Sequence, residues 1–136
     1  MVNKIIIFIS IVALIALAFL LNSTGFVSLV TVKDKIPKVT DIVDFTHNSE
    51  VYVGDTAKFY MTIANNRVVI PQVTLYDSSW QDSTTIKGYE IQPGISEVLL
   101  QWKADKPGTY YAVANILDQS GNKLATKMSY VYVITR

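Results

Sequence analysis

Hydrophobic and polar positions divide the chain into two parts with different periodicities. Residues 5–21 are continuously apolar apart from one serine, whereas beyond residue 39 short alternating runs are separated by turn residues. A continuous apolar run predicts a helix in lipid, and alternation with period two predicts half-buried β-strands. We therefore expect an N-terminal transmembrane α-helix within residues 1–25, a linker or extra strand over 26–38, and a β-domain over 39–136.

The apolar run is close to the minimum length for crossing a bilayer. Its 17 residues make a helix of about 25 Å, against a hydrocarbon core of about 30 Å. We expect its side chains to contact membrane lipid or partner helices. The membrane-spanning positions that we single out are Ile5, Phe8, Ile11, Leu14, Leu17 and Leu21.

The same run has two interpretations, a retained signal anchor or a cleaved signal peptide. Lys4 precedes it, and Ala16-Leu17-Ala18 has the spacing that a signal peptidase accepts. However, Phe19-Leu20-Leu21 continues the apolar run beyond that point, which favours the anchor. A short N-terminal tail then stays in the cytoplasm. The expected location is the cell membrane, with a single pass and an extracytoplasmic C-terminal domain.

The segment 26–32 has no unique interpretation from its sequence. It extends the membrane helix, or it forms a β-strand that packs on its own domain or on the open sheet edge of a neighbour. Gly25 and the β-branched residues favour the strand, and nearness to the bilayer favours the helix. Phe26 and Leu29 are candidate partner contacts within it.

Seven strands are expected in the remaining part of the chain. Phe59, Met61 and Ile63 alternate with polar neighbours, which sets one face of a strand inside. Pro71 predicts a sheet edge or a bulge, because proline cannot donate a ladder hydrogen bond. Residues 47–50 are expected to form a turn. The expected strands cover residues 39–45, 57–64, 68–76, 84–91, 95–102, 109–117 and 123–135.

Composition excludes several classes of function. The chain has 12 basic and 11 acidic side chains, and because Lys4 is the only charge before residue 33, the remainder has no net formal charge. A neutral domain has no field to attract nucleic acid, so we expect no nucleic-acid partner. Without cysteine the chain has no disulfide framework and no thiolate ligand.

The residues for catalysis or metal binding are missing or badly spaced. A copper site needs a thiolate and two imidazoles, and a serine triad needs a histidine base. His47 is the only histidine, and we expect it to be a solvated turn residue. Asp77 with Asp82, or Asp118 with Asn122, lack the Asp-x-Asp spacing of a calcium loop. We expect no catalytic residue, cofactor, metal or small-molecule substrate.

Aromatic residues are therefore the candidates for recognition. Trp102 fits a buried strand position, whereas Trp80 lies in a polar loop, where it is either a lid over one end of the domain or an interface anchor. On strand 109–117 we expect Tyr110, Ala112, Ala114 and Ile116 to face inward. Tyr111, Val113 and Leu117 then face outward, and Tyr111 and Val113 are candidate partner contacts. For Tyr130 and Tyr132 against Val131 and Val133, the sequence does not decide which pair is inside.

Two passages resemble known families. Residues 53–59 followed by Asn65-Asn66 are similar to the second-strand entry of archaeal and bacterial immunoglobulin-like surface modules. Residues 107–111 followed by 118–122 are similar to the sixth strand and last hairpin of polycystic-kidney-disease-type repeats. By layout the chain also resembles accessory proteins of the archaeal motility filament and pilin-like subunits, although the pilin-type processing site, a charged residue then Gly or Ala just before the apolar run, is absent: Asn3-Lys4-Ile5 stands there. The resemblance implies an all-β, seven-stranded immunoglobulin-like sandwich after one transmembrane helix.

These features together predict a non-enzymatic role. We expect a membrane-anchored extracytoplasmic domain that is a structural or interaction subunit of a surface or membrane assembly. The alternatives are a cofactor-free accessory subunit of a respiratory or transport complex, a filament or pilin-like subunit, and a secreted binding module released after Ala18.

Overall fold

The structure is a computed structural model that describes the backbone of residues 27–33 and 36–136, with side chains from Ile36 onward. Within these residues the named secondary-structure elements are all β-strands. The same residues contain no helix long and apolar enough to cross a bilayer. The expected membrane segment 1–25, with its six positions from Ile5 to Leu21, and Phe26 lie outside the described residues. They remain predictions.

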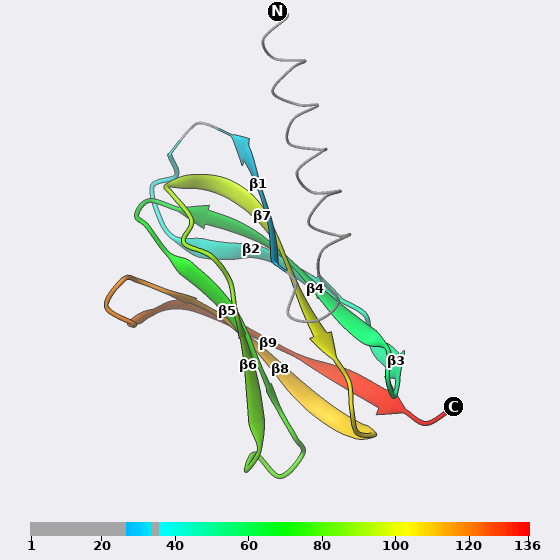
Figure 1. Cartoon of the computed structure of the whole chain (residues 1–136). Helices are drawn as coiled ribbons and strands as arrows, with labels where there is room; N and C mark the ends of the chain where they lie inside the picture. The colour runs from blue at the N-terminus through cyan, green and yellow to red at the C-terminus, as the bar shows by residue number, and fades with distance from the viewer. Residues whose placement is uncertain (1–26, 34–35) are drawn as a thin grey trace, which may run out of the picture.

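Nine strands form two sheets in the described part of the chain (Figure 1). The four-stranded sheet has the order β1-β7-β4-β2, and the five-stranded sheet has the order β3-β9-β8-β5-β6. All neighbours are antiparallel except β3 and β9, which are parallel. The strands are β1 (Val27–Lys33), β2 (Asp41–His47), β3 (Glu50–Tyr52), β4 (Thr56–Asn65), β5 (Ile70–Tyr76), β6 (Ser83–Lys87), β7 (Gly94–Lys103), β8 (Gly108–Leu117) and β9 (Lys123–Ile134).

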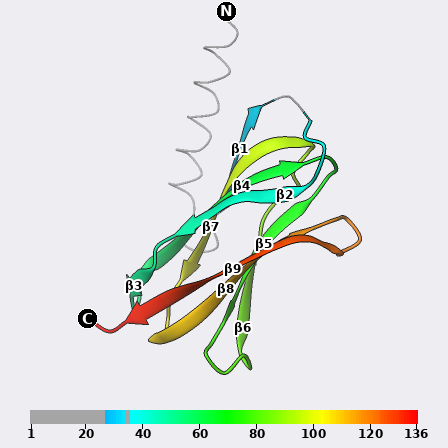
Figure 2. The ribbon, with the colours of Figure 1, turned by 180° about the vertical axis from the view of Figure 1, so that it is seen from behind.

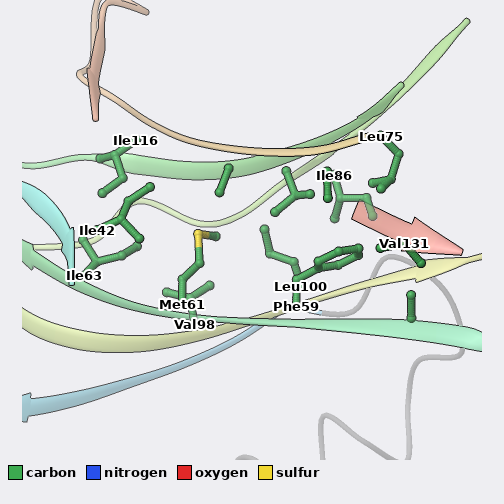
Figure 3. Packing of buried hydrophobic residues seen from close by; sticks show 14 of the residues in the cluster. Ile42, Phe59, Met61, Ile63, Leu75, Ile86, Val98, Leu100, Ile116 and Val131 are labelled. Carbon is green, nitrogen blue, oxygen red and sulfur yellow. The ribbon is translucent and has the colours of Figure 1, made fainter. Parts of the chain in front are cut away.

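The hydrophobic core lies between the two sheets (Figure 3). Phe59, Met61 and Ile63 of β4 are almost completely buried, as their alternation predicts. They face side chains of the five-stranded sheet such as Leu75 and Ile116. Large aliphatic residues from both inner faces thus fill the space between the sheets, which makes the domain an all-β sandwich.

The strand count differs from the seven that the sequence predicts. β1 is a strand paired with β7 from Val27↔Leu100 to Lys33↔Ile95, so residues 27–33 adopt the strand alternative. β3 is the other addition, and its three residues pair with the end of β9 (Figure 2). The expected turn 47–50 is shortened to Asn48-Ser49, because His47 still pairs in β2 and Glu50 already pairs in β3.

Pro71 does not mark a sheet edge, but the other alternative, a bulge, is present beside it: the pairing shifts by one residue between Gln72↔Lys87 and Val69↔Ile91. Its strand β5 lies between β8 and β6. Pro71 is accommodated because pairing with β6 starts one residue later, at Gln72, while its carbonyl accepts the N–H of Gly88 at 2.7 Å. A Cβ on Gly88 would lie 2.8 Å from the Cγ of Pro71. This close packing lies directly after β6. That strand ends at Lys87, whereas the sequence predicts that it continues to residue 91.

Candidate interaction surface

The outer face of the five-stranded sheet carries a row of tyrosines. The register pairs Tyr76 of β5 with Tyr111 of β8, and Tyr111 with Tyr130 of β9. Residues that are directly opposite on antiparallel strands project from the same face. The neighbours Leu75, Ala112 and Val131 are buried and point inward. The three tyrosine side chains therefore project from the outside of the sandwich, on neighbouring strands.

Trp80 packs on this row instead of covering the end of the sandwich. Its ring stacks on Tyr111 at a centroid distance of 4.3 Å and an interplanar angle of 14°, and it lies 5.0 Å from the ring of Tyr76. Tyr130 meets Tyr111 edge-on at 5.1 Å. We call Tyr76, Trp80, Tyr111 and Tyr130 the aromatic patch. Trp80 and Tyr130 remain 49% and 47% exposed, so the patch is open to solvent.

Beyond the aromatic patch the outer sheet face continues toward the β8–β9 hairpin, first with an apolar pair and then with a polar one. The next outward-facing pair toward the β8–β9 hairpin is Val113 with Met128, and the pair after it is Asn115 with Thr126. The Thr126 hydroxyl donates to the Asn115 side-chain oxygen at 2.7 Å. On the other side Tyr132 continues the apolar surface along β9 and is 47% exposed. Exposed apolar side chains on this sheet face thus extend from Tyr132 past the aromatic patch to Met128.

The loop that carries Trp80 is held by Asp77. One carboxylate oxygen of Asp77 accepts the Ser79 hydroxyl at 2.7 Å and the Ser79 N–H at 3.1 Å. The Trp80 N–H donates to the Asp77 carbonyl at 3.0 Å, and the Asp77 N–H donates to the Asp82 carbonyl at 3.1 Å. The Ser79 hydrogen bond, with weaker help from backbone N–H groups, lowers the pKa of Asp77. The ionised carboxylate therefore organises the loop 77–82.

Trp80 adopts a left-handed backbone conformation, with φ of 62°. This region costs an ordinary L-residue about 1–2 kcal/mol, and it is much rarer for a large aromatic residue than for glycine or asparagine. Ring stacking contributes about 0.5–1.5 kcal/mol beyond area burial. The stack on Tyr111 thus offsets much of the backbone cost and fixes the ring on the outer face.

A cavity of about 410 Å³ lies at the end of the sandwich next to this loop. Its inner wall includes Trp102 at the end of β7 and Tyr110 at the start of β8, whose rings meet at 4.9 Å and 63°. The Tyr110 hydroxyl donates to the Lys106 carbonyl at 2.8 Å, which fixes the loop before β8. We call this space the end cavity. Its lining residues are Leu75, Asp77, Asp82, Ser83, Thr84, Trp102, Asp105, Lys106 and Tyr110.

The remaining predicted residues occupy defined places. Tyr111 and Val113 are half-buried on the outer face, as expected, and Ala112, Ala114 and Ile116 are buried on the inner one. Leu29 lies in β1, where its backbone pairs with Val98. Trp102 is only partly buried against the core.

His47 is not the solvated turn residue that the sequence predicts. It ends β2, its Nε2 lies 2.7 Å from the Ser129 hydroxyl, and its Nδ1 lies 2.7 Å from the Asn48 carbonyl. Its ring centroid is 5.5 Å from those of Phe45 and Phe59. These contacts link β2 to β9 across one side of the sandwich, which is a structural role.

The two loops considered for calcium use their carboxylates in their own turns. Asp118 accepts the N–H groups of Ser120 and Asn122 and the Asn122 side-chain amide. The Asn122 side-chain hydrogen bond is the main reason that the pKa of Asp118 is lowered. Among the residues with described side chains, no group of three or more His, Asp or Glu residues is placed to hold a metal ion.

Sequence reasoning missed the end cavity and half of the aromatic patch. Asp77 and Asp82 come from one loop, and Asp105 and Lys106 from another, so only the fold brings them together. For Tyr130, both alternating faces of the last strand look apolar in the sequence. The detectable signal was that Tyr111 faces outward, since any aromatic residue paired with it has to share that face.

Comparisons with known proteins give no family. No protein-family model matches the chain, and no curated protein matches it. Among solved structures, it is similar to the CARDB domain of the PF1109 protein from Pyrococcus furiosus, at 17% identity over 77% of this chain and 95% of that one, with a TM-score of 0.39. It is also similar to the sporulation control protein Spo0M from Bacillus subtilis, at 12% identity over 74% of this chain and 51% of that one, with a TM-score of 0.49.

A third similar structure is the superoxide reductase (neelaredoxin) from Ignicoccus hospitalis. The identity is 10% over 70% of this chain and 82% of that one, and the TM-score is 0.42. Likeness at these TM-scores carries no argument about function. The description of the fold therefore rests on the strand pairing of the chain itself.

Proposed function

We propose that this chain is a non-enzymatic, membrane-anchored, extracytoplasmic immunoglobulin-like domain that serves as an interaction subunit of a surface or membrane protein assembly. The observation that carries the proposal is the aromatic patch. Trp and Tyr are the residues most enriched at the energetic centres of protein interfaces. Here one strained Trp and three Tyr rings are gathered on an open sheet face.

Rigid packing makes the aromatic patch suited to binding. Tyr111 contacts both Trp80 and Tyr130, and Trp80 also contacts Tyr76, so the four rings restrict each other. Side chains that are ordered before binding lose less conformational entropy in a complex. The patch thus has both the chemistry and the order of an interface anchor.

The immunoglobulin-like assignment is supported by two features of the domain. Tyr110, at the start of β8, donates its hydroxyl to the carbonyl of Lys106 four residues upstream, as in the tyrosine corner of immunoglobulin-like sandwiches. The chain also changes sheets between β2 and β3, and β3 runs parallel to the last strand. Such domains support many unrelated functions, so the fold alone does not name the partner.

The membrane location rests on the apolar run 5–21. Extraction of native membranes with alkaline carbonate is expected to leave the chain in the pellet, and mass spectrometry is expected to find an N-terminus before residue 5. A soluble chain that begins at Phe19 would contradict the anchor.

The interaction role is tested by co-purification from native membranes. The double variant Trp80→Ala, Tyr130→Ala is expected to lose the proteins that co-purify with the natural chain. Tyr60→Ala is the matched control, because Tyr60 is 48% exposed but lies on β4 of the other sheet. A lone monomer without co-purifying protein, or equal recovery with all variants, would overturn the proposal. A redox or transport complex among the recovered proteins would favour the accessory-subunit alternative over a filament or surface-layer assembly.

A further inference from the structure

We propose that the end cavity receives a basic side chain, a guanidinium or ammonium group, that a protein partner presents beside the aromatic patch. The inference rests on the proposed function, since it names a chemical group of the partner.

Two loops and the ends of both sheets form the cavity. The β5–β6 loop contributes Asp77 and Asp82, and the β7–β8 loop contributes Asp105 and Lys106. Trp102 and Tyr110 form an aromatic wall. A volume of about 410 Å³ lies within the range of pockets that bind small groups. The space is therefore large enough for a long side chain.

The lining has three carboxylates and one amine. Among the residues with described side chains, the ion pair within 4.0 Å is that of Arg136 with Asp55, outside this cavity, so Lys106 forms no ion pair with the three carboxylates. Asp77 keeps its charge over a wider pH range because its pKa is lowered. Burial, and then the charges of Asp77 and Asp105, raise the pKa of Tyr110, in keeping with carboxylates that lie near the aromatic wall.

The aromatic wall adds to the selection for a cation. A guanidinium or ammonium group is attracted to the electron-rich face of Trp or Tyr, and a carboxylate at the same site adds charge-assisted hydrogen bonds. Arginine fits such a site best, because its planar group stacks on rings and donates in two directions. A neutral group would not offset the net negative charge of the lining.

The position of the cavity connects it to the aromatic patch. Asp77 and Asp82 line the cavity, and Trp80 between them stacks on Tyr111 on the outer sheet face. One six-residue loop, 77–82, therefore contributes to both surfaces. A partner that covers Trp80 has its neighbouring side chains within reach of the cavity.

Fluorescence of Trp102 provides a direct test in the full chain, held in a mild detergent. Trp80→Phe leaves Trp102 as the single tryptophan of the chain, and Trp102 lines the cavity. Titration with N-acetylarginine methylamide is expected to give a saturable change in its emission. Asp77→Asn with Asp105→Asn is expected to weaken this binding at least about tenfold, and Lys106→Gln to strengthen it a few-fold.

Asp118→Asn is the matched control. It alters the same kind of aspartate turn, at the opposite end of β8, and is expected to leave the titration unchanged. Asparagine at position 77 still accepts the hydrogen bonds that shape its loop, so the double variant tests charge.

Three results would overturn the inference. The first is no saturable change in emission up to about 50 mM, a range in which very weak binding is still measurable. The second is equal binding of the neutral N-acetylglutamine methylamide. The third is equal binding of N-acetylarginine methylamide by the double variant. Tighter binding of the free diamine putrescine, by about tenfold, would overturn the assignment to a partner's side chain. None of these titrations contains a partner protein, so their failure is separate from a failure of the co-purification.

Discussion

The two hairpin loops of the five-stranded sheet begin with the same chemistry. In the β5–β6 loop Asp77 accepts the N–H of Ser79, and in the β8–β9 loop Asp118 accepts the N–H of Ser120. Hydrogen bonds to the carboxylate lower the pKa of both aspartates. The sequence of either loop predicts a turn for the same reason, since aspartate side chains bond to the backbone two residues on.

The loops differ in the residue that adopts a positive φ. In the β8–β9 loop it is Gly121, at 88°, where glycine has no steric cost. In the β5–β6 loop it is Trp80, at 62°, where the backbone is strained and the ring is held by Tyr111. Strain of this kind persists where the surroundings over-determine it, and it is concentrated at functional sites. The contrast indicates that the β8–β9 loop only closes a hairpin, whereas the β5–β6 loop presents an aromatic ring.

Among the variants that test this difference between the loops, Tyr111→Ala is expected to lower the free energy of unfolding most. It removes the ring that both Trp80 and Tyr130 contact, so we expect a loss of about 2 kcal/mol in the free energy of unfolding. Urea denaturation followed by far-UV circular dichroism measures it. Tyr132→Ala, on the same face, is the control and is expected to cost less than about 0.5 kcal/mol. Equal losses for the two variants would show that the stack does not hold the loop.

Gly121→Ala is expected to have the next largest effect on the free energy of unfolding. A Cβ at this position meets nothing within 4 Å, so the cost comes from the backbone conformation alone. We expect the free energy of unfolding to fall by about 1 kcal/mol. The same denaturation experiment measures it, and an unchanged midpoint would show that the loop relaxes to a negative φ.

Trp80→Gly compared with Trp80→Ala isolates the strain in the other loop. Both variants lose the stack on Tyr111, but only glycine accepts a φ of 62° at no cost. The glycine variant is expected to be more stable than the alanine variant by about 0.5–1 kcal/mol. If alanine is the more stable of the two, the positive φ is not retained in solution.

The smallest expected effect is a dependence on pH that the two loops share. A carboxylate with a lowered pKa in the folded state stabilises the fold fully above its ordinary pKa of 3.8. This stabilisation is lost as the pH falls through the lower folded-state value. Thermal unfolding between pH about 6 and about 2 should show a loss of stability toward acid that is reduced by Asp77→Asn and by Asp118→Asn. Equal slopes in all three proteins would contradict it.

The alternation of apolar residues was sufficient to predict most of the sandwich. Phe59, Met61 and Ile63 are inside because period two sets one face of a strand inward. β3 was missed because its three residues are too few to show a period. The segment 26–32 was undecided because its β-branched residues favour a strand, whereas its nearness to the bilayer favours a helix. Pro71 left an edge and a bulge open because the sequence does not show where the neighbouring strand begins to pair; the structure has the bulge.

The candidate surface was only partly predictable for a different reason. Trp80 and Tyr111 were identified because a large ring in a polar loop, or on an outward strand position, has no expected partner inside. That they stack on each other follows from the register of β5, β6 and β8, which the local sequence does not contain. The end cavity likewise depends on two loops that meet only in the folded chain.

Site-specific photo-crosslinking in cells that produce the protein tests the central claim most directly. A photoreactive phenylalanine analogue replaces Tyr130 in the aromatic patch or, in a second strain, Tyr60 on the other sheet, two positions of nearly equal exposure. The interaction role predicts a discrete adduct from position 130 that is absent from position 60 and is lost when Trp80→Ala is added. No adduct from position 130, or the same adducts from both positions, would contradict it.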